Sequence, residues 1–447
     1  MFLARAAVLF FWGALPSLAA DRADSYFQRG LELASRNDVE GAIGQFEMAV
    51  RLRADFSDAW FNLGALLHKK GDTESAIDAL KKALAIRPGH IEALNALGLI
   101  LEQQGQVAQA IDLLQRALRI KPDFQEARHN LAIADTSIGN LREAIEQCKL
   151  VVAARPTWAA PRFTLGRAEK LLGETSQAIE NYRHALRLDP HSAACRYHLG
   201  RLLANTGKDA EALSEFRQSA ELDAGNKSYR YALARALKAG GHAEDAQAEF
   251  ARVQTLTERE RAAEQAGAEN TAGIGLAEKG LLDAAAASFN RAIQIEPTLA
   301  DAHYNLGGVL LRTGDTPRAL AAFQRAVELK PAFIDARDQL ASMLVNANQW
   351  QAAAGQFEEI LRLRPGRLEA RYRLVEVLQQ LGDHQGVVRE LSQCLLLDPD
   401  NAASHYNLGV ALALGTGDRE RAAVEFHRAL ALKPDYEDAR KALAAVR

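Results

Sequence analysis

The chain has 447 residues, of which 48% are hydrophobic and 25% are charged, and its formal net charge is −3. The near-neutral charge gives no indication of a nucleic-acid partner, and three cysteines are too few for a disulfide-rich fold. A chain of this length would ordinarily divide into two or three globular domains of roughly 100–200 residues each.

The first twenty residues are expected to form a secretory signal peptide. Arg5 precedes the apolar run 6–15, Pro16 follows it, and Ser17-Leu18-Ala19 puts small residues at the minus-three and minus-one positions of a cleavage site. The alternative is an uncleaved anchor, but the run is shorter than the roughly 20 residues that a membrane-spanning helix needs. Cleavage predicts an exported protein, located in a bacterial periplasm or outside the cell. An uncleaved segment would be the chain's one contact with a membrane.

The rest of the chain repeats with a period of 34 residues. The period is clearest in two series of prolines: Pro88, Pro122, Pro156 and Pro190, then Pro297, Pro331, Pro365 and Pro399. A second series consists of residues that tolerate the left-handed conformation at a helix end. Its members are Gly71, Gly105, Gly139, Gly173, Gly207, Gly241, Gly280, Gly314, Gly382 and Gly417, with Asn37 and Asn348 in two of the units.

Each unit is predicted to be a pair of antiparallel helices. In residues 57–90, apolar residues recur at helical spacing before Gly71, a second apolar stripe follows, and Pro88 ends it. Gly64 and Ala83 are small because the two helices must approach closely. The template fits twelve times, starting at Ala23, Ser57, Ile91, Gln125, Ala159, Ala193, Lys227, Ala266, Ala300, Ile334, Leu368 and Ala402. Residues 437–447 add one further helix, which is expected to cap the last unit.

These units resemble tetratricopeptide repeats, a family with a 34-residue helix–turn–helix period. The resemblance is carried by Trp60-Phe-Asn-Leu-Gly64, His303-Tyr-Asn-Leu-Gly307 and His405-Tyr-Asn-Leu-Gly409, and it covers about residues 23–447. It implies an all-α, right-handed superhelical α-solenoid of about twelve repeats. It also implies a scaffold that binds peptides or proteins in a concave groove, and it leaves their identity open.

Two irregularities interrupt the period. Five extra residues precede the eighth repeat, and residues 244–266 contain no internal glycine or proline, which predicts one long charged helix. A lengthened helix would divide the array into two arms, 21–265 and 266–447; the alternative is a local bulge. The second irregularity is one extra residue at Gly415-Thr416-Gly417, to which we assign no role.

Sequence signatures of enzymes are absent. The chain has no HExxH, no phosphate-binding loop and no GxSxG. His191, Cys195 and His198 have the spacing of metal ligands on one helix face, but His191 falls in a predicted turn and a fourth ligand is not evident. We therefore expect no catalytic residues, no metal and no cofactor.

A basic tract in repeats five to seven is the sharpest functional signal. The first helices of these repeats, 159–172, 193–206 and 227–240, carry nine lysines and arginines against one acid, Glu169. In tetratricopeptide repeats the fifth and ninth positions of the first helix usually face the ligand, which points to residues in this tract. The candidate peptide-binding residues are Phe163, Arg167, Lys170, Tyr197, Arg201, Tyr231, Arg235 and Lys238.

Arginine can grip a carboxylate with two parallel hydrogen bonds, so the hypothesis is an acidic segment or a C-terminal carboxylate bound across these repeats. The alternatives are a solvated basic face and arginines paired with acids of neighbouring helices. The family's carboxylate clamp also uses asparagines, but Asn62, Asn130, Asn305 and Asn407 match that position outside the basic tract. Recognition of a chaperone tail is therefore not expected.

Three classes of function remain open at this point. The favoured class is a non-enzymatic scaffold of the cell envelope or exterior, because the whole chain after residue 20 is repeat. The second is an accessory protein of a glycosyltransferase or polysaccharide export pathway, and the third is an enzyme. Other proteins or peptides are the expected partners, and oligomerisation through the ends of the array is left open.

Overall fold

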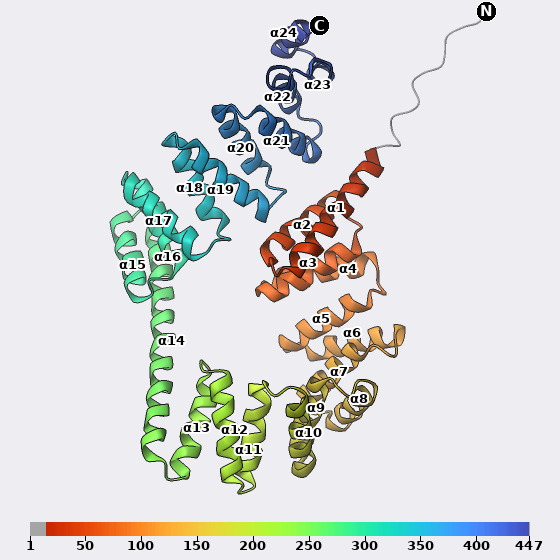
Figure 1. Ribbon diagram of the computed structural model, residues 1–447, viewed down its shortest axis with the longest axis vertical. Coiled ribbons are helices and arrows are strands. Elements are labelled where there is room, and N and C mark those ends of the chain that lie inside the picture. Colours follow the sequence, from red (N-terminus) through yellow and green to blue (C-terminus); the bar gives the residue numbers. More distant parts are fainter. Residues whose placement is uncertain (1–14, 447) are drawn as a thin grey trace, which may run out of the picture. The chain divides into compact units, whose positions relative to one another are not determined.

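The computed structural model describes residues 15–446, and every regular element in this range is helical. The helices follow one another in antiparallel pairs (Figure 1). The first helices of the pairs are α1 (Leu15–Ser35), α3 (Ser57–Lys70), α5 (Ile91–Gln103), α7 (Gln125–Ser137), α9 (Ala159–Leu172), α11 (Ala193–Asn205), α13 (Lys227–Ala239), α16 (Ala300–Arg312), α18 (Ile334–Asn346), α20 (Leu368–Leu381) and α22 (Ala402–Ala411). Residues 1–14 of the predicted signal peptide lie outside the described residues.

Each first helix packs on the second helix of its own pair, except that α13 packs on the first part of α14 (Ala243–Glu278) and α15 (Leu282–Ile295) on its last part. The second helices are α2 (Val39–Leu52), α4 (Thr73–Ile86), α6 (Val107–Ile120), α8 (Leu141–Ala154), α10 (Thr175–Leu188), α12 (Asp209–Leu222), α15 (Leu282–Ile295), α17 (Thr316–Leu329), α19 (Trp350–Leu363), α21 (His384–Leu397) and α23 (Arg419–Leu432). The predicted α-solenoid of helix pairs is confirmed. The last helix, α24 (Glu437–Val446), packs on α23 and buries Ala439 and Leu443, so the expected capping helix is present.

The turn inside each pair has the predicted left-handed residue. Gly71 ends α3 with a φ of 93°, and its amide donates to the carbonyls of Leu67 and His68. Asn37 and Asn348 adopt the same conformation, with φ angles of 61° and 57°. Asparagine therefore replaces glycine here without a change of turn, because its short polar side chain tolerates this region of conformational space.

The two helices of a pair meet at a glycine of the first helix. At Gly307, a Cβ atom would lie 2.9 Å from the ring of Phe323, which is fully buried in α17. Gly64 stands in the same relation to Leu80, at 2.8 Å, and Gly166 to Tyr182, at 2.8 Å. The glycine therefore makes room for the largest core side chain of its own repeat.

Two neighbouring glycines of α16 make this packing testable. We expect Gly307→Ala to destabilise the protein by about 1–3 kcal/mol, because the added Cβ would lie only 2.9 Å from the buried Phe323 ring. We expect Gly308→Ala to stabilise it by roughly 0.5–1 kcal/mol, because a Cβ there meets nothing within 4 Å and alanine favours the helix. Urea unfolding followed by circular dichroism measures both, and equal effects of the two variants would contradict the packing account.

A recurring polar contact joins the repeats at the fourth position of the first helix. Arg196 donates to the Pro190 carbonyl at 2.8 Å and to the Glu215 carboxylate of the next helix at 2.8 Å. We call this arrangement the position-four latch. The same carbonyl contact, six residues upstream, is made by Arg128, Arg230, His303, Arg337, Arg371, His405 and Arg440. The latch satisfies a carbonyl of the turn between repeats, which has no helical partner of its own.

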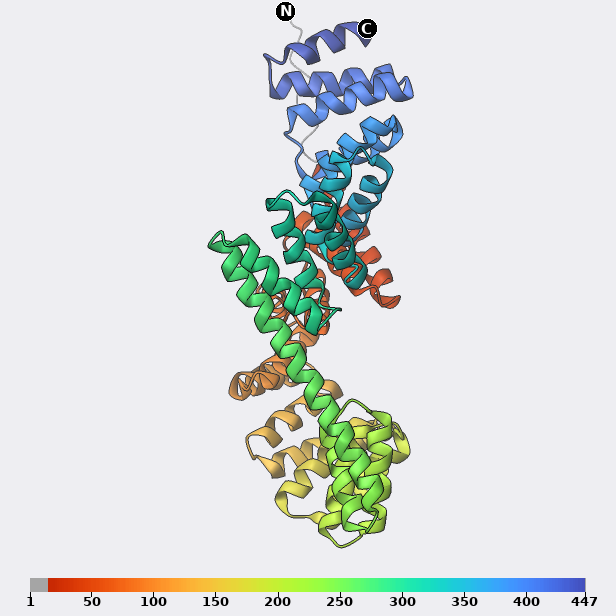
Figure 2. The ribbon, with the colours of Figure 1, turned by 90° about the vertical axis from the view of Figure 1, so that its left-hand side faces the viewer.

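The irregularity in the middle of the chain is a single helix, α14 (Ala243–Glu278), of 36 residues (Figures 1 and 2). The sequence predicted a long helix here, but its predicted end at Ala266 is wrong. The helix continues through that position and through Gly267, Gly273 and Gly275. The helix is therefore about a dozen residues longer than residues 244–266 suggested.

The extra residue of repeat twelve is absorbed by one turn of π-helix, η1 (Leu412–Thr416), which ends at Gly417.

The chain separates into two compact units, one of residues 55–262 and the other of residues up to 54 together with those from 263 onward. The division into arms 21–265 and 266–447 stays a prediction, but the first repeat groups with the later repeats rather than with the earlier ones. In that unit α2 packs directly on α19. Gly44 lies so close to the Leu363 carbonyl that a Cβ would come within 2.0 Å of its oxygen, and Asp38 pairs with Arg362.

None of the helices that the structure describes combines the length and the apolar character needed to cross a membrane.

The three cysteines, Cys148, Cys195 and Cys394, are all buried as free thiols. Burial raises the pKa of the Cys148 thiol to about 12. These thiols are therefore protonated at neutral pH and act as small core residues.

Candidate functional site

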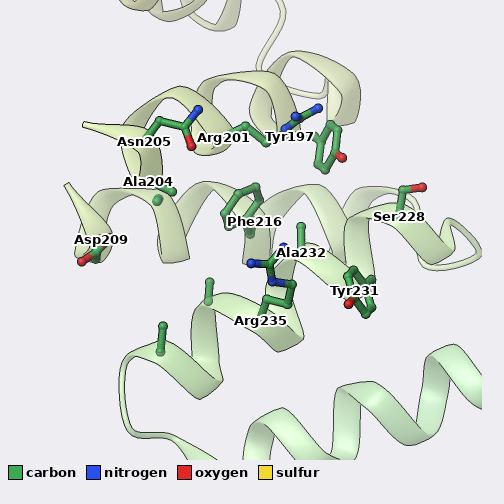
Figure 3. A pocket seen from close by; sticks show the side chains of 13 residues that line it. Tyr197, Arg201, Ala204, Asn205, Asp209, Phe216, Ser228, Tyr231, Ala232 and Arg235 are labelled. Carbon is green, nitrogen blue, oxygen red and sulfur yellow. The ribbon is translucent and has the colours of Figure 1, made fainter. Parts of the chain in front are cut away.

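A pocket of about 520 Å³ lies between α11, α12 and α13, within the unit 55–262. Figure 3 shows its side chains at close range. It is lined by Tyr197, Arg201, Ala204, Asn205, Asp209, Ala212, Phe216, Ser228, Tyr231, Ala232, Arg235, Ala236 and Ala239. Two arginines, two tyrosines and an amide therefore surround an apolar floor formed by Phe216 and alanines.

Helical spacing places an aromatic ring and an arginine side by side at each wall. Tyr197 and Arg201 are four residues apart on α11, and the guanidinium carbon of Arg201 lies 5.7 Å from the Tyr197 ring centroid. The Tyr197 ring also packs on Tyr229 of the next repeat, at 4.9 Å between centroids, so its position is held from both sides. Tyr231 is 49% exposed, so about half of its side chain is open to a ligand.

A second group of cations adjoins the pocket through Arg201. Burial lowers the pKa of Lys170, and the charges of Arg201 and then Arg167 lower it further, which places the three cations close together. Burial also lowers the pKa of His198 to about 4, with Lys170, Arg167 and Arg201 acting in the same direction. The His198 imidazole is therefore neutral at pH 7 and adds no charge to the site.

The cations of this site have no acidic partners. Among residues 15–446, no carboxylate lies within ion-pair distance of Arg167, Lys170, Arg201 or Arg235, although Asp209 lines the pocket. Glu169, the one acid of the predicted tract, is buried, accepts hydrogen bonds from the Asn181 amide at 2.8 and 3.0 Å, and has a pKa raised by burial. Unpaired clustered cations favour an anionic ligand, because bringing a carboxylate there relieves their mutual repulsion.

Three other basic residues of the same three helices have structural roles. Arg196 and Arg230 are latch residues that pair with Glu215 and Glu249 at 2.8 and 2.9 Å, and Lys227 pairs with Glu260. The interpretation of arginines paired with neighbouring acids therefore holds for these three. It does not hold for the four cations of the site.

The predicted site residues fall into three groups. Tyr197, Arg201, Tyr231 and Arg235 line the pocket itself. Arg167 and Lys170 lie beside it, around His198, together with Phe163, whose ring is half-buried against Tyr182 and His198 at 5.7 and 5.5 Å. Lys238 is exposed and is not part of the pocket wall. Whether any of them binds a ligand stays a prediction.

Sequence reasoning missed Asn205, Asp209 and Ser228, which also line the pocket. Asn205 is the last residue of α11 and Asp209 the first of α12, so both sit beside a turn that repeat spacing marks only through Gly207. No periodic signal distinguishes them. Only Asn205, four residues after Arg201 on α11, could have been placed next to it from helical spacing.

A second pocket, of about 410 Å³, lies in the other unit against α14 and α16, and two of its polar side chains, Asn305 and Arg312, are already engaged. Asn305 donates to Asn270 at 3.0 Å, and Arg312 donates to the Ala277 carbonyl at 3.1 Å. In the described range 15–446, histidine, cysteine and acidic side chains nowhere gather in threes that could hold a metal ion. The cationic pocket of repeats six and seven is therefore the better candidate for ligand binding.

The chain is similar to several solved structures that are also built of helix pairs. The chain is 27% identical to MamA over 36% of this chain and 94% of that one, with a TM-score of 0.32. It is 15% identical to a tetratricopeptide repeat protein of Parabacteroides merdae, over 53% and 93%, with a TM-score of 0.44. It is 20% identical to PilF of Pseudomonas aeruginosa, over 47% and 96%, with a TM-score of 0.42. No curated protein matches the chain.

Family models match along most of the array. Models described as tetratricopeptide repeats match residues 55–123, 101–162, 193–226, 300–333 and 344–412. A further model, described as a TPR repeat, matches residues 166–207 and 276–314. Together they cover more than half of the sequence, in agreement with the helix pairs and the left-handed turns, and the chain belongs to the tetratricopeptide repeat family.

Proposed function

We propose that this protein is a non-enzymatic scaffold that binds acidic protein segments across repeats five to seven. Repeats of this family bind proteins or peptides, which provides the general class of function. The observation that carries the specific proposal is the row of arginines Arg167, Arg201 and Arg235, for which residues 15–446 provide no acidic partner. Arg196 and Arg230, on two of the same helices, are by contrast neutralised by pairing.

The pocket offers the chemistry that such a ligand needs. Guanidinium groups can each bind a carboxylate with two hydrogen bonds, and the Tyr197 and Tyr231 rings offer flat apolar contact. The Asn205 side chain can donate to a backbone carbonyl of the ligand and accept from a backbone amide.

The proposal is tested by the binding of a fluorescein-labelled acidic peptide, measured by anisotropy at low and at physiological salt. We expect binding by the wild type that weakens as salt rises, because the cations are partly exposed and screened. A lysine-containing peptide of the same length is the control and is expected not to bind. Equal binding of both peptides would contradict an anion-selective groove.

We also propose that the protein is exported. The support is the arrangement of Arg5, the apolar run 6–15 and the small residues Ser17 and Ala19. An intact mass of the protein purified from its native host is expected to correspond to a chain beginning at Ala20. A mass that includes residues 1–19 would contradict cleavage. No observation on the described residues favours the alternative of a carbohydrate-pathway accessory.

A further inference from the structure

The cations of the candidate site form a row with the spacing of the repeat itself. Arg167, Arg201 and Arg235 occupy the ninth position of three successive first helices, α9, α11 and α13. Arg167 and Arg201 both act on the pKa of His198, and Arg201 and Arg235 line the same pocket. Arg201 and Arg235 therefore share one pocket, and Arg167 lies beside it on the preceding first helix.

The helices that carry the row contact one another directly. The Phe163 ring of α9 lies 5.5 Å from the His198 ring of α11, and the Tyr197 ring of α11 lies 4.9 Å from the Tyr229 ring of α13. Axes of helices in such contact lie about 8–10 Å apart. Equivalent side chains on successive helices are therefore expected at intervals of about 10 Å.

Few peptide conformations present side chains at this interval on one face. A β-strand rises about 3.3 Å per residue, so three residues span the interval, but successive side chains alternate and the third residue faces away. A polyproline II helix rises about 3.1 Å per residue with three residues per turn, so every third side chain returns to the same face after about 9 Å. Its period therefore matches both the distance and the direction of the arginine row.

The rest of the pocket also suits a polyproline II ligand. Such a helix has no internal hydrogen bonds, so its carbonyls need donors, and it is commonly recognised by grooves lined with aromatic rings. The pocket has the Tyr197 and Tyr231 rings and hydroxyls, together with the Asn205 amide. The Tyr231 ring packs edge-on against Phe250, with 5.8 Å between the centroids, and about half of the side chain remains exposed.

Resting on the proposed function, we infer that repeats five to seven recognise a segment in polyproline II conformation with an acidic residue at every third position. The three acidic side chains meet Arg167, Arg201 and Arg235 in order. The intervening residues, proline or other non-acidic residues, contact Tyr197 and Tyr231. This ligand class is narrower than acidic segments in general, because the acidic residues must also have the three-residue spacing.

The test uses labelled peptides of identical composition, each with three glutamates in a background of proline and alanine. In one the glutamates are at every third position, in another at every second position, and in a third they are contiguous. We expect the first to bind the wild-type protein about a hundred-fold more tightly than the others, since two of the three carboxylates in those peptides are misplaced and each loses a charge-assisted hydrogen bond. A fourth, helix-forming peptide has glutamates at every seventh position, the spacing at which an α-helix spans the same interval.

A double-mutant cycle assigns the register. Arg201→Gln is combined with replacement of the middle glutamate by glutamine, and in parallel with replacement of an outer one. We expect the effects of Arg201→Gln and of replacing the middle glutamate on the binding free energy to be coupled. The effects of Arg201→Gln and of replacing an outer glutamate should be nearly additive. Equal affinity for all arrangements would overturn the spacing and leave the proposed function standing. Tighter binding of the fourth peptide would overturn the polyproline II conformation. Binding of none would remove the proposed function as well.

Discussion

Reversing the charge of three arginines of the candidate site, in Arg167→Glu/Arg201→Glu/Arg235→Glu, is expected to abolish binding of an acidic peptide. Each arginine is expected to supply a charge-assisted hydrogen bond worth about 1.5–3 kcal/mol, and every 1.4 kcal/mol is a tenfold change in affinity. The loss of three such bonds therefore weakens binding by about three orders of magnitude or more. Repulsion between the new carboxylates and the ligand adds to this loss.

The matched control reverses three exposed arginines of α6, α8 and α10 in the same unit, in Arg119→Glu/Arg142→Glu/Arg187→Glu. This variant changes the net charge by the same amount without touching the groove, so it separates local contacts from overall charge. We expect less than about a tenfold effect on affinity, because long-range charge acts mainly through screened attraction. Similar losses in both variants would contradict a localised site.

Folding of the groove variant is checked by circular dichroism and urea unfolding. Arg167 is half-buried, so a neutral triple variant, Arg167→Gln/Arg201→Gln/Arg235→Gln, provides a second measurement that does not place new negative charges together. It is also expected to lose binding. A folded glutamine variant that binds as the wild type does would rule out these arginines as the ligand contacts.

The second large effect is expected at the most buried latch, where Arg371 is 6% exposed and Glu390 is 7% exposed. Arg371 donates to the Pro365 carbonyl at 2.7 Å and pairs with Glu390. We expect Arg371→Ala to destabilise the unit by about 3–5 kcal/mol, because it leaves a buried carboxylate and a buried carbonyl without this partner. The exposed guanidinium of Arg389, 2.9 Å from Glu390, can offset only part of that cost.

Arg183→Ala is the reference for this effect. Arg183 pairs with Glu211, but both side chains are about half-exposed. Loss of an exposed pair costs at most about 1 kcal/mol. Urea unfolding gives both values, and Arg371→Met/Glu390→Leu is expected to recover part of the stability because it removes both charges together. If Arg371→Ala cost no more than Arg183→Ala, the latch would not be a structural element.

Some features were predictable because they depend on local backbone chemistry. Asn37 and Asn348 could be placed at turns from sequence spacing alone, and both have positive φ angles. The helices at Ser57, Ile334 and Ala402 begin where the repeat template starts. Each of these features depends on a few consecutive residues and on their intrinsic backbone preferences, which do not require contacts with the rest of the fold.

The long helix α14 shows where period and local chemistry disagree. The repeat template predicted a new helix at Ala266, but the residues before it contain neither proline nor a left-handed turn residue. The second helix of one repeat therefore continues into the first helix of the next. Gly267 and Gly275 are tolerated inside it although each costs about 1 kcal/mol relative to alanine.

The candidate site divides in the same way between sequence and tertiary structure. The sequence by itself determined the helix pairs, the left-handed turns and the excess of basic residues in repeats five to seven, because these follow from spacing and composition. Only the tertiary structure decided that Arg196 is held by Glu215 while Arg201, five residues later, opens into a pocket with Tyr231. The reason is that pairing depends on which side chains neighbouring helices bring within a few ångströms, and that distance is set by packing between repeats rather than by residues adjacent in the chain.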